Sequence, residues 1–294
     1  MSATSASLDA RWPNASASSK LEAGGLTWHL QDFGAGPPLL MLHGTGAASH
    51  SWRVLAPLLA ERFRVLAPDL PGHGFSTAPR TPDAFSIGGM GRAIHALLVT
   101  LQVDPVLAVG HSAGAAILVR MALDRLIAPR VLISLNGALL PMSGFPGWLF
   151  APLARLMARG DFVPHWVARR ARDRGVIERL IRNTGSRLDA EGIRCYQTLA
   201  ERPRHVAAAL QMMAQWDLRT LAHDLPRLQV PLVLLSSAGD RTIPPEQTAR
   251  VKSILPDARA VSLGALGHLA HEENPQLTAG IILRMAAQAG IVPE

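Results

Sequence analysis

The chain has 294 residues, of which 48% are apolar and 17% are charged. This composition excludes a disordered chain, which would hold fewer apolar residues and more charge. The single cysteine, Cys195, excludes a framework of internal disulfides and any metal site built from several cysteines. The net charge of +7 comes from scattered arginines, and we expect no nucleic-acid partner because they form no dense run with interleaved aromatic residues.

Two segments bear on targeting and on membranes. Residues 1–20 are rich in serine and alanine, and we expect a mobile N-terminal tail there rather than a signal peptide. No residue between Arg130 and Arg155 is charged, but prolines and glycines interrupt this stretch throughout. A lipid-exposed helix could not satisfy the freed backbone groups, so we expect a buried strand, an apolar kinked loop and no transmembrane segment. The expected location is the cytoplasm, with peripheral attachment to the inner membrane as an alternative.

Strand-like and helix-like segments alternate along most of the chain. Short apolar runs predict strands over 26–31, 38–42, 64–67, 105–109, 131–135, 232–235 and 259–262. Helical spacing of apolar residues predicts helices over 52–61, 87–101, 113–126, 245–254 and 272–289. Such alternation is typical of a doubly wound, mostly parallel α/β sheet.

The middle of the chain, residues 139–225, breaks this alternation. It has no clear strand and many arginines, and Val206, Leu210, Met213 and Asp217 follow helical spacing. We therefore expect a helical cap over residues 139–225, inserted into a core made of residues 21–138 and 226–294.

A serine on a strand-to-helix turn is the strongest chemical signal. Gly110-His-Ser112-Ala-Gly114 follows an apolar strand and opens a helical segment. Small residues two before and two after the serine allow a strained turn that lifts its hydroxyl above the sheet. This context predicts that Ser112 is a nucleophile.

A serine hydroxyl needs an oriented base, and in this architecture the order along the chain is serine, acid, histidine. Asp240 follows the strand at 232–235, and His268 follows the last strand. The other natural place for the acid, after the strand at 131–135, holds Asn136 instead. Ser112, Asp240 and His268 are therefore the predicted catalytic triad.

Two backbone amides are candidates for an oxyanion hole. His43-Gly44-Thr45-Gly46 follows the strand at 38–42, and such a turn can point the N–H of Thr45 to the same place as the N–H of Ala113. The remaining histidines show no recognised ligand spacing. We expect no metal and no cofactor.

These motifs together resemble the α/β-hydrolase family over nearly the whole chain. The strings that carry the resemblance are MLHGTGAASHSWR, APDLPGHGFS, VGHSAGAAILVRMALD, SLNGALLP and LGHLAHEE. The resemblance implies an eight-stranded sheet with a helical cap inserted after the sixth strand. It also implies the Ser112, Asp240, His268 triad and the oxyanion donors Thr45 and Ala113. All three triad positions are present in this chain.

Within the family, the strings are similar to accessory proteins encoded with bacteriochlorophyll biosynthesis genes. This similarity implies a tetrapyrrole pathway and association with magnesium chelatase components. The triad implies hydrolysis of an apolar small molecule, either a tetrapyrrole or an acyl ester or thioester; acyl transfer and carbon–carbon cleavage stay open. The alternative is a weakly catalytic or non-catalytic porphyrin-binding protein, and Met212, Met213 and Trp216 of the cap are candidates to line its pocket.

Overall fold

A computed structural model describes residues 12–141 and 162–293. Its strands are β1 (Ser18–Ala23), β2 (Leu26–Phe33), β3 (Pro38–Leu42), β4 (Arg64–Pro68), β5 (Leu107–His111), β6 (Val131–Leu135), β7 (Leu232–Ser236) and β8 (Arg259–Ser262). They form one sheet in the order β1-β2-β4-β3-β5-β6-β7-β8. β2 runs antiparallel to β1 and β4, and every other neighbouring pair is parallel. The predicted eight-stranded, mostly parallel sheet is confirmed.

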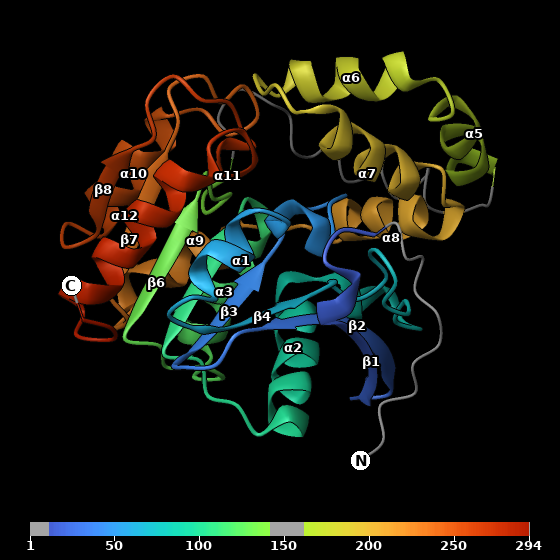
Figure 1. The fold of residues 1–294 in the computed structure, drawn as a ribbon. Coiled ribbons are helices and arrows are strands. Elements are labelled where there is room, and N and C mark those ends of the chain that lie inside the picture. Colours follow the sequence, from blue (N-terminus) through green and yellow to red (C-terminus); the bar gives the residue numbers. More distant parts are fainter. Residues whose placement is uncertain (1–11, 142–161, 294) are drawn as a thin grey trace.

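The helices fall into a core set and a cap set. The core set is α1 (Leu55–Leu59), α2 (Ile87–Leu101), α3 (Ala113–Leu123), α10 (Glu246–Ile254), α11 (Ala270–Glu273) and α12 (Pro275–Gln288). Between β6 and β7 lie α5 (Phe162–Arg170), α6 (Arg174–Asn183), α7 (Ala190–Ala200), α8 (Pro203–Ala214) and α9 (Arg219–Asp224). Short 3-10 helices are η1 (Ala15–Ala17), η2 (Ser49–Trp52), η3 (Pro82–Phe85) and η4 (Leu225–Arg227). Figure 1 shows α5–α8 gathered beyond the end of the sheet to which β3 and β6 point.

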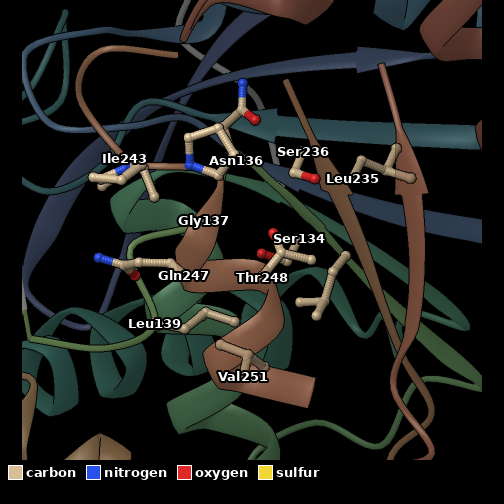
Figure 2. Close-up of a pocket in the computed structure, with 13 residues that line it drawn as sticks. Ser134, Asn136, Gly137, Leu139, Leu235, Ser236, Ile243, Gln247, Thr248 and Val251 are labelled. Atoms are coloured by element: carbon tan, nitrogen blue, oxygen red, sulfur yellow. The ribbon is translucent and has the colours of Figure 1, made fainter. Parts of the chain in front are cut away.

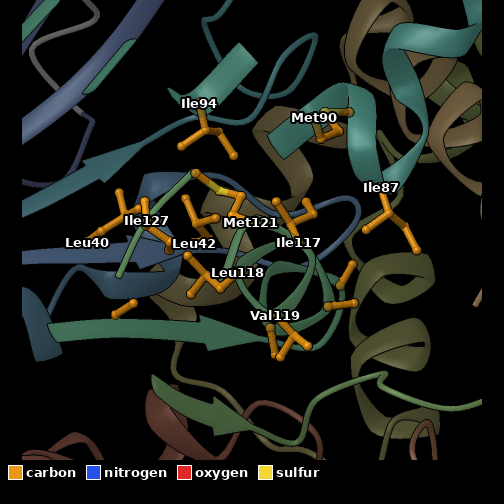
Figure 3. Close-up of a cluster of buried hydrophobic side chains, with 14 of the residues drawn as sticks. Leu40, Leu42, Ile87, Met90, Ile94, Ile117, Leu118, Val119, Met121 and Ile127 are labelled. Atoms are coloured by element: carbon orange, nitrogen blue, oxygen red, sulfur yellow. The ribbon is translucent and has the colours of Figure 1, made fainter. Parts of the chain in front are cut away.

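Both faces of the sheet are buried, which explains why its strands are continuous apolar runs. Successive side chains of β3 point to opposite faces: Leu40 and Leu42 join one core cluster with α2 and α3, whereas Leu39 and Met41 join a second cluster with α1 and α12. Figure 3 shows the first cluster, in which side chains of α2 and α3 interdigitate above β3.

The structure differs from the sequence-based expectations mainly at the N-terminus. Residues 12–20, expected in a mobile tail, are packed: Trp12 is buried against Ala48 and Leu199, and Lys20 lies in β1. The sequence analysis did not predict β1, because its residues are mostly polar and only half-buried. The predicted final helix is two helices, α11 and α12, separated at Asn274. The kinked loop predicted after β6 lies outside the described residues beyond Pro141, and no helix in the described ranges could cross a bilayer.

The turn from β5 into α3 depends on two glycines. A Cβ on Gly114 would lie 2.1 Å from the carbonyl oxygen of Leu42, and a Cβ on Gly110 would lie 2.5 Å from the backbone of Ala115. Real Cβ atoms do not approach backbone so closely, so any larger residue would push α3 away from β3. By contrast, a Cβ on Gly280 of α12 would meet nothing within 4 Å.

We therefore expect opposite effects from the same substitution at two helical glycines. Gly114→Ala should lower the free energy of unfolding by about 3 kcal/mol, because the added methyl overpacks a rigid backbone contact. Gly280→Ala, the matched control, should raise it by roughly 0.5–1 kcal/mol, because alanine loses less backbone entropy in a helix. Urea titration of both purified variants measures this. Equal effects of the two substitutions would contradict the close approach of α3.

Six buried histidines have a pKa held below the usual value near 6.5, chiefly because burial disfavours the charged imidazolium. For His271 the pKa falls to about 3 and for His205 to about 4. The other four are His43, His50, His73 and His111. Below pH 6.5 the unfolded chain binds protons at these positions and the folded chain does not.

The fold should therefore lose stability as the pH falls from 6.5 toward 4. Each histidine contributes a loss of up to about 1.4 kcal/mol per pH unit, because the unfolded state takes up as much as one proton more than the folded state. Burial raises the pKa of Glu272 and works in the opposite sense, but it is a single group. Urea unfolding at pH 7.5 and pH 5.5 measures the difference, and equal or greater stability at pH 5.5 would refute it.

Candidate active site

Ser112 sits on a strained backbone turn between β5 and α3. Its φ of 50° and ψ of −116° place a non-glycine residue at positive φ, at a cost of roughly 1–3 kcal/mol that the surrounding packing must offset. The Ser112 N–H donates to the carbonyl of Leu135, and its own carbonyl accepts from Ala138. The side chain remains half-buried, above the N-terminus of α3, where partial positive charge favours a developing anion.

Asp240 and His268 form a buried hydrogen-bonded pair. Asp240 Oδ2 lies 2.8 Å from Nδ1 of His268, and the two side chains are 1% and 8% exposed. The other carboxylate oxygen, Oδ1, accepts from the backbone N–H of Thr242 and of Ile243. With both oxygens engaged, the carboxylate fixes the orientation of the imidazole and leaves Nε2 as the nitrogen available for proton transfer.

The loops that carry Ser112 and His268 lie against each other. His111, which precedes Ser112, packs its ring against that of His268 with centroids 4.6 Å apart. Among the described residues, Ser112 Oγ and His268 do not share a hydrogen bond. Such a bond is often long outside the substrate complex and tightens during catalysis. The structure thus brings the three predicted residues to one edge of the sheet, and the bond between serine and histidine remains a prediction.

Gly44, in the loop after β3, lies close to Ser112. A Cβ on Gly44 would lie 3.1 Å from the Cβ of Ser112 and 3.0 Å from Nδ1 of His111, so a larger residue would crowd both side chains. His43 holds the loop from the other side: its Nε2 accepts from the N–H of Leu70, and its Nδ1 lies 2.8 Å from the carbonyl of Gly44. Ala113, the first residue of α3, has no intrahelical acceptor for its N–H, and Thr45 and Ala113 remain the candidate oxyanion donors.

Asn136 forms hydrogen bonds to both the loop that carries Asp240 and the loop that carries His268. At a φ of 43°, it places its amide nitrogen 3.1 Å from the carbonyl of Gly267 and 3.0 Å from that of His268. Its amide oxygen accepts from the backbone N–H of Ser237. His111 Nε2 also lies 3.0 Å from the carbonyl of His268. Sequence reasoning treated Asn136 only as a missing acid and gave His111 no role, and it missed that both contact the loop of His268.

Residues 184–186 of the cap lie between the loop of Asp240 and the loop of His268. The carbonyl of Thr184 accepts from the N–H of His268 and from that of Arg241, and Ser186 Oγ accepts from the N–H of Leu269. Gly185, at a φ of +87°, passes so close to Gly239 that a Cβ would lie 2.0 Å from its carbonyl oxygen. Nothing in the sequence pattern at 184–186 indicates this role.

A buried ionic network also joins the cap to the loop after His268. Glu272 accepts from Ser51, from the Tyr196 hydroxyl of α7 and from Arg53. Arg53 also lies 2.9 Å from Asp189, which caps the N-terminus of α7. Burial raises the pKa of Glu272 although its three partners act against this. The network fixes α7 against the core through charged groups that are costly to separate once buried.

The three cap residues predicted to line a pocket lie in different surroundings. Met212 is fully buried, and its sulfur accepts from the hydroxyl of Thr45 at 3.5 Å. Trp216 is half-buried and packs against the core cluster around α2 and α3. Met213 is exposed. Met212 is therefore in contact with the candidate oxyanion loop.

A small cavity of about 20 Å³ lies behind the loop of Asp240. Figure 2 shows it enclosed by side chains from β6, β7 and α10, including Asn136 and Gln247. The amide of Gln247 is buried without a hydrogen-bond partner among the described residues. The volume is about that of one water molecule, so this cavity is too small for an organic substrate. No cluster of three metal-ligating side chains occurs within residues 12–141 and 162–293.

Comparison with known proteins places the chain in a family. The alpha/beta hydrolase fold family matches residues 37–275. The chain is 39% identical over 278 residues to the Magnesium-chelatase 30 kDa subunit of Rhodobacter capsulatus, covering 94% of this chain and 96% of that protein. It is 27% identical to the uncharacterized hydrolase YugF of Bacillus subtilis, covering 81% and 86%.

Solved structures agree in fold. An alpha/beta hydrolase fold protein from Burkholderia ambifaria superposes with a TM-score of 0.73 at 24% identity, covering 90% of this chain and 96% of that one. A serine hydrolase involved in carbazole degradation superposes with a TM-score of 0.74 at 20% identity, covering 92% and 98%. The sequence strings also resemble BchO, an accessory protein of bacteriochlorophyll biosynthesis, in keeping with the Rhodobacter relative. With the sheet order and the family match across most of its length, this chain belongs to the α/β-hydrolase family.

Proposed function

We propose that the protein is a serine hydrolase that cleaves an ester or thioester through an acyl-enzyme. The observation that carries the proposal is the buried Asp240–His268 hydrogen bond beside a serine held at positive φ. Asp69 and His29 form a similar buried pair, but among the described residues Ser112 is the one serine at positive φ, and it lies beside the Asp240–His268 pair. The strained turn at Ser112 likewise has a cost that a scaffold alone does not explain.

The mechanism follows from the positions of these groups. His268 Nε2 takes the proton of Ser112 as the serine oxygen attacks the substrate carbonyl carbon. The N–H groups of Thr45 and Ala113 stabilise the oxyanion of the tetrahedral intermediate. His268 then returns the proton to the departing alcohol or thiol, which leaves an acyl group on Ser112. A water molecule deprotonated by His268 hydrolyses this ester, releasing a carboxylic acid and the free serine.

A second candidate function is tetrapyrrole binding with little or no catalysis. The observation that favours it is the 39% identity to a protein named as a magnesium-chelatase subunit. Porphyrins are flat and apolar with carboxylate side chains, and a cap rich in arginine beside apolar residues suits them. On this proposal the protein acts in bacteriochlorophyll biosynthesis, in association with magnesium chelatase components, and the hydrolase fold serves as a scaffold.

We place the protein in the cytoplasm, with its cap able to rest on the inner membrane. On α5 the side chains of Phe162 and Trp166 are 80% and 55% exposed. They are four residues apart, and therefore lie on one helical face with Arg170. Exposed aromatic residues beside arginine suit the interface of an anionic bilayer, from which an apolar substrate could enter.

Ser112→Ala tests the nucleophile. A fluorophosphonate probe should label the wild-type protein and not the variant, because only an activated serine displaces fluoride from phosphorus. Turnover of a short p-nitrophenyl ester should fall by roughly 10⁴-fold or more. The variant should keep its unfolding free energy within about 0.5 kcal/mol, because the substitution removes one oxygen that is not buried in the core. Labelling or full turnover by the pure variant would reject the assignment, and an unlabelled wild type would favour the binding function.

Asp240→Asn tests the acid. The amide should leave His268 in the wrong tautomer and lower turnover by roughly 10⁴-fold. Asp257→Asn is the matched control, since Asp257 is exposed in the turn before β8 and its loss should leave turnover unchanged. The ester assay at pH 7.5 compares both variants with wild type. The reverse order of activities would show that the acid lies elsewhere.

A further inference from the structure

A cavity of about 640 Å³ opens beside the cap, apart from the three triad residues. It lies between α8, β1 and the segment 72–82 that follows β4. Pockets for organic ligands have volumes of roughly 300–1,000 Å³, so this one is large enough for a ligand of several rings. None of Ser112, Asp240 and His268 lines it.

The wall of the cavity combines an apolar surface with positive charge. Its apolar part comes from Phe75, Pro79, Pro82, Phe85, Ala207 and Ala208. Its charged part is Lys20, Arg80, Arg202 and Arg204, and no aspartate or glutamate is among the lining residues. None of the four cations forms an ion pair with another residue of the described part of the chain; Lys20 and Arg202 are half-buried, and Arg80 and Arg204 are exposed. Four cations on one wall with no carboxylate among the lining residues create a positive potential that favours binding of an anion.

One of the cations is held in place before any ligand binds. The Arg202 guanidinium lies 4.3 Å from the centroid of the Phe75 ring, and its Nη1 donates to the carbonyl of Gly74. Arg202 also precedes the N-terminus of α8, which adds partial positive charge. A fixed guanidinium loses less entropy when it pairs with a carboxylate, and it can do so with two parallel hydrogen bonds.

The cavity also touches the loop of the candidate oxyanion donor. His205 lines the cavity, and its Nδ1 accepts from the N–H of Gly74. Its Nε2 therefore carries the proton and faces the carbonyl of Gly46 at 3.2 Å. Gly46 follows Thr45, so His205 connects the wall of the cavity to the loop that carries Thr45.

We propose that this cavity is a second binding site, for an amphipathic organic anion with a flat apolar body and two or more carboxylates. The apolar wall covers the body, and Arg80, Arg202, Arg204 and Lys20 pair with the carboxylates. The proposal does not depend on hydrolysis at Ser112. Only the choice of a tetrapyrrole as the probe rests on the second proposed function.

Titration of the full chain with protoporphyrin IX, followed by porphyrin fluorescence anisotropy, tests the site. Wild type should bind saturably near micromolar concentration. Arg80→Gln with Arg204→Gln should raise the dissociation constant at least tenfold; both side chains are exposed, so the fold should survive. Arg62→Gln with Arg284→Gln, two exposed arginines that do not line the cavity, is the matched control and should bind like wild type. Ala207→Phe, which fills the cavity without removing charge, should also weaken binding.

Two further measurements distinguish binding at this cavity from binding in the catalytic pocket and from non-specific adsorption of the porphyrin. The dimethyl ester of protoporphyrin has the same ring without free carboxylates and should bind at least tenfold more weakly. Ser112→Ala should bind protoporphyrin like wild type whether or not Ser112 is a nucleophile, and the fluorophosphonate adduct, where it forms, should do the same. Equal binding of acid and ester, indifference to the Arg80 and Arg204 substitutions, or displacement by the adduct would each overturn the proposal.

Discussion

The structure depends on how closely α3 approaches the sheet at Ser112. A Cβ at Gly110 or Gly114 would overlap backbone atoms, and one at Gly44 would crowd the side chains of His111 and Ser112; the turn holds Ser112 at a φ of 50°. Because β3 and β5 are neighbours in the sheet, the same approach brings the Thr45 loop and the N-terminus of α3 together. A larger side chain at Gly110 or Gly114 would displace the turn of Ser112, even if the rest of the sheet stayed intact.

Asp240 and His268 are positioned by hydrogen bonds rather than by close packing. The carbonyl of His268 accepts from Asn136 and lies within hydrogen-bond distance of His111, while the N–H of His268 donates to Thr184 of the cap. Backbone groups in loops have no partners from regular secondary structure, so side chains and neighbouring loops must satisfy them. The histidine is therefore positioned by its own backbone as much as by Asp240.

Sequence reasoning could locate the parts of this site that local rules determine. The glycines flanking Ser112 and the strand-end positions of Asp240 and His268 follow from turn sterics and from the geometry of parallel sheets. Asn136, Thr184 and Ser186 could not be found in this way, because their roles depend on partners that are 57 to 132 residues distant along the chain. The half-buried β1 and the packed Trp12 were missed for a related reason: their neighbours are set by tertiary contacts and not by periodicity.

The contacts of residues 184–186 with the loops of Asp240 and His268 limit how the cap can vary among related proteins. Caps of this kind are natural places for sequence to vary, since insertions between core strands leave the sheet unchanged. Here, however, Gly185 fills a space between the loops of Asp240 and His268 where only glycine fits, and Thr184 closes the backbone hydrogen bonds of both loops. Exchange of the cap as a module would therefore have to keep Gly185 and the hydroxyl of Ser186, whereas position 184 needs only the same backbone path, because it acts through its carbonyl.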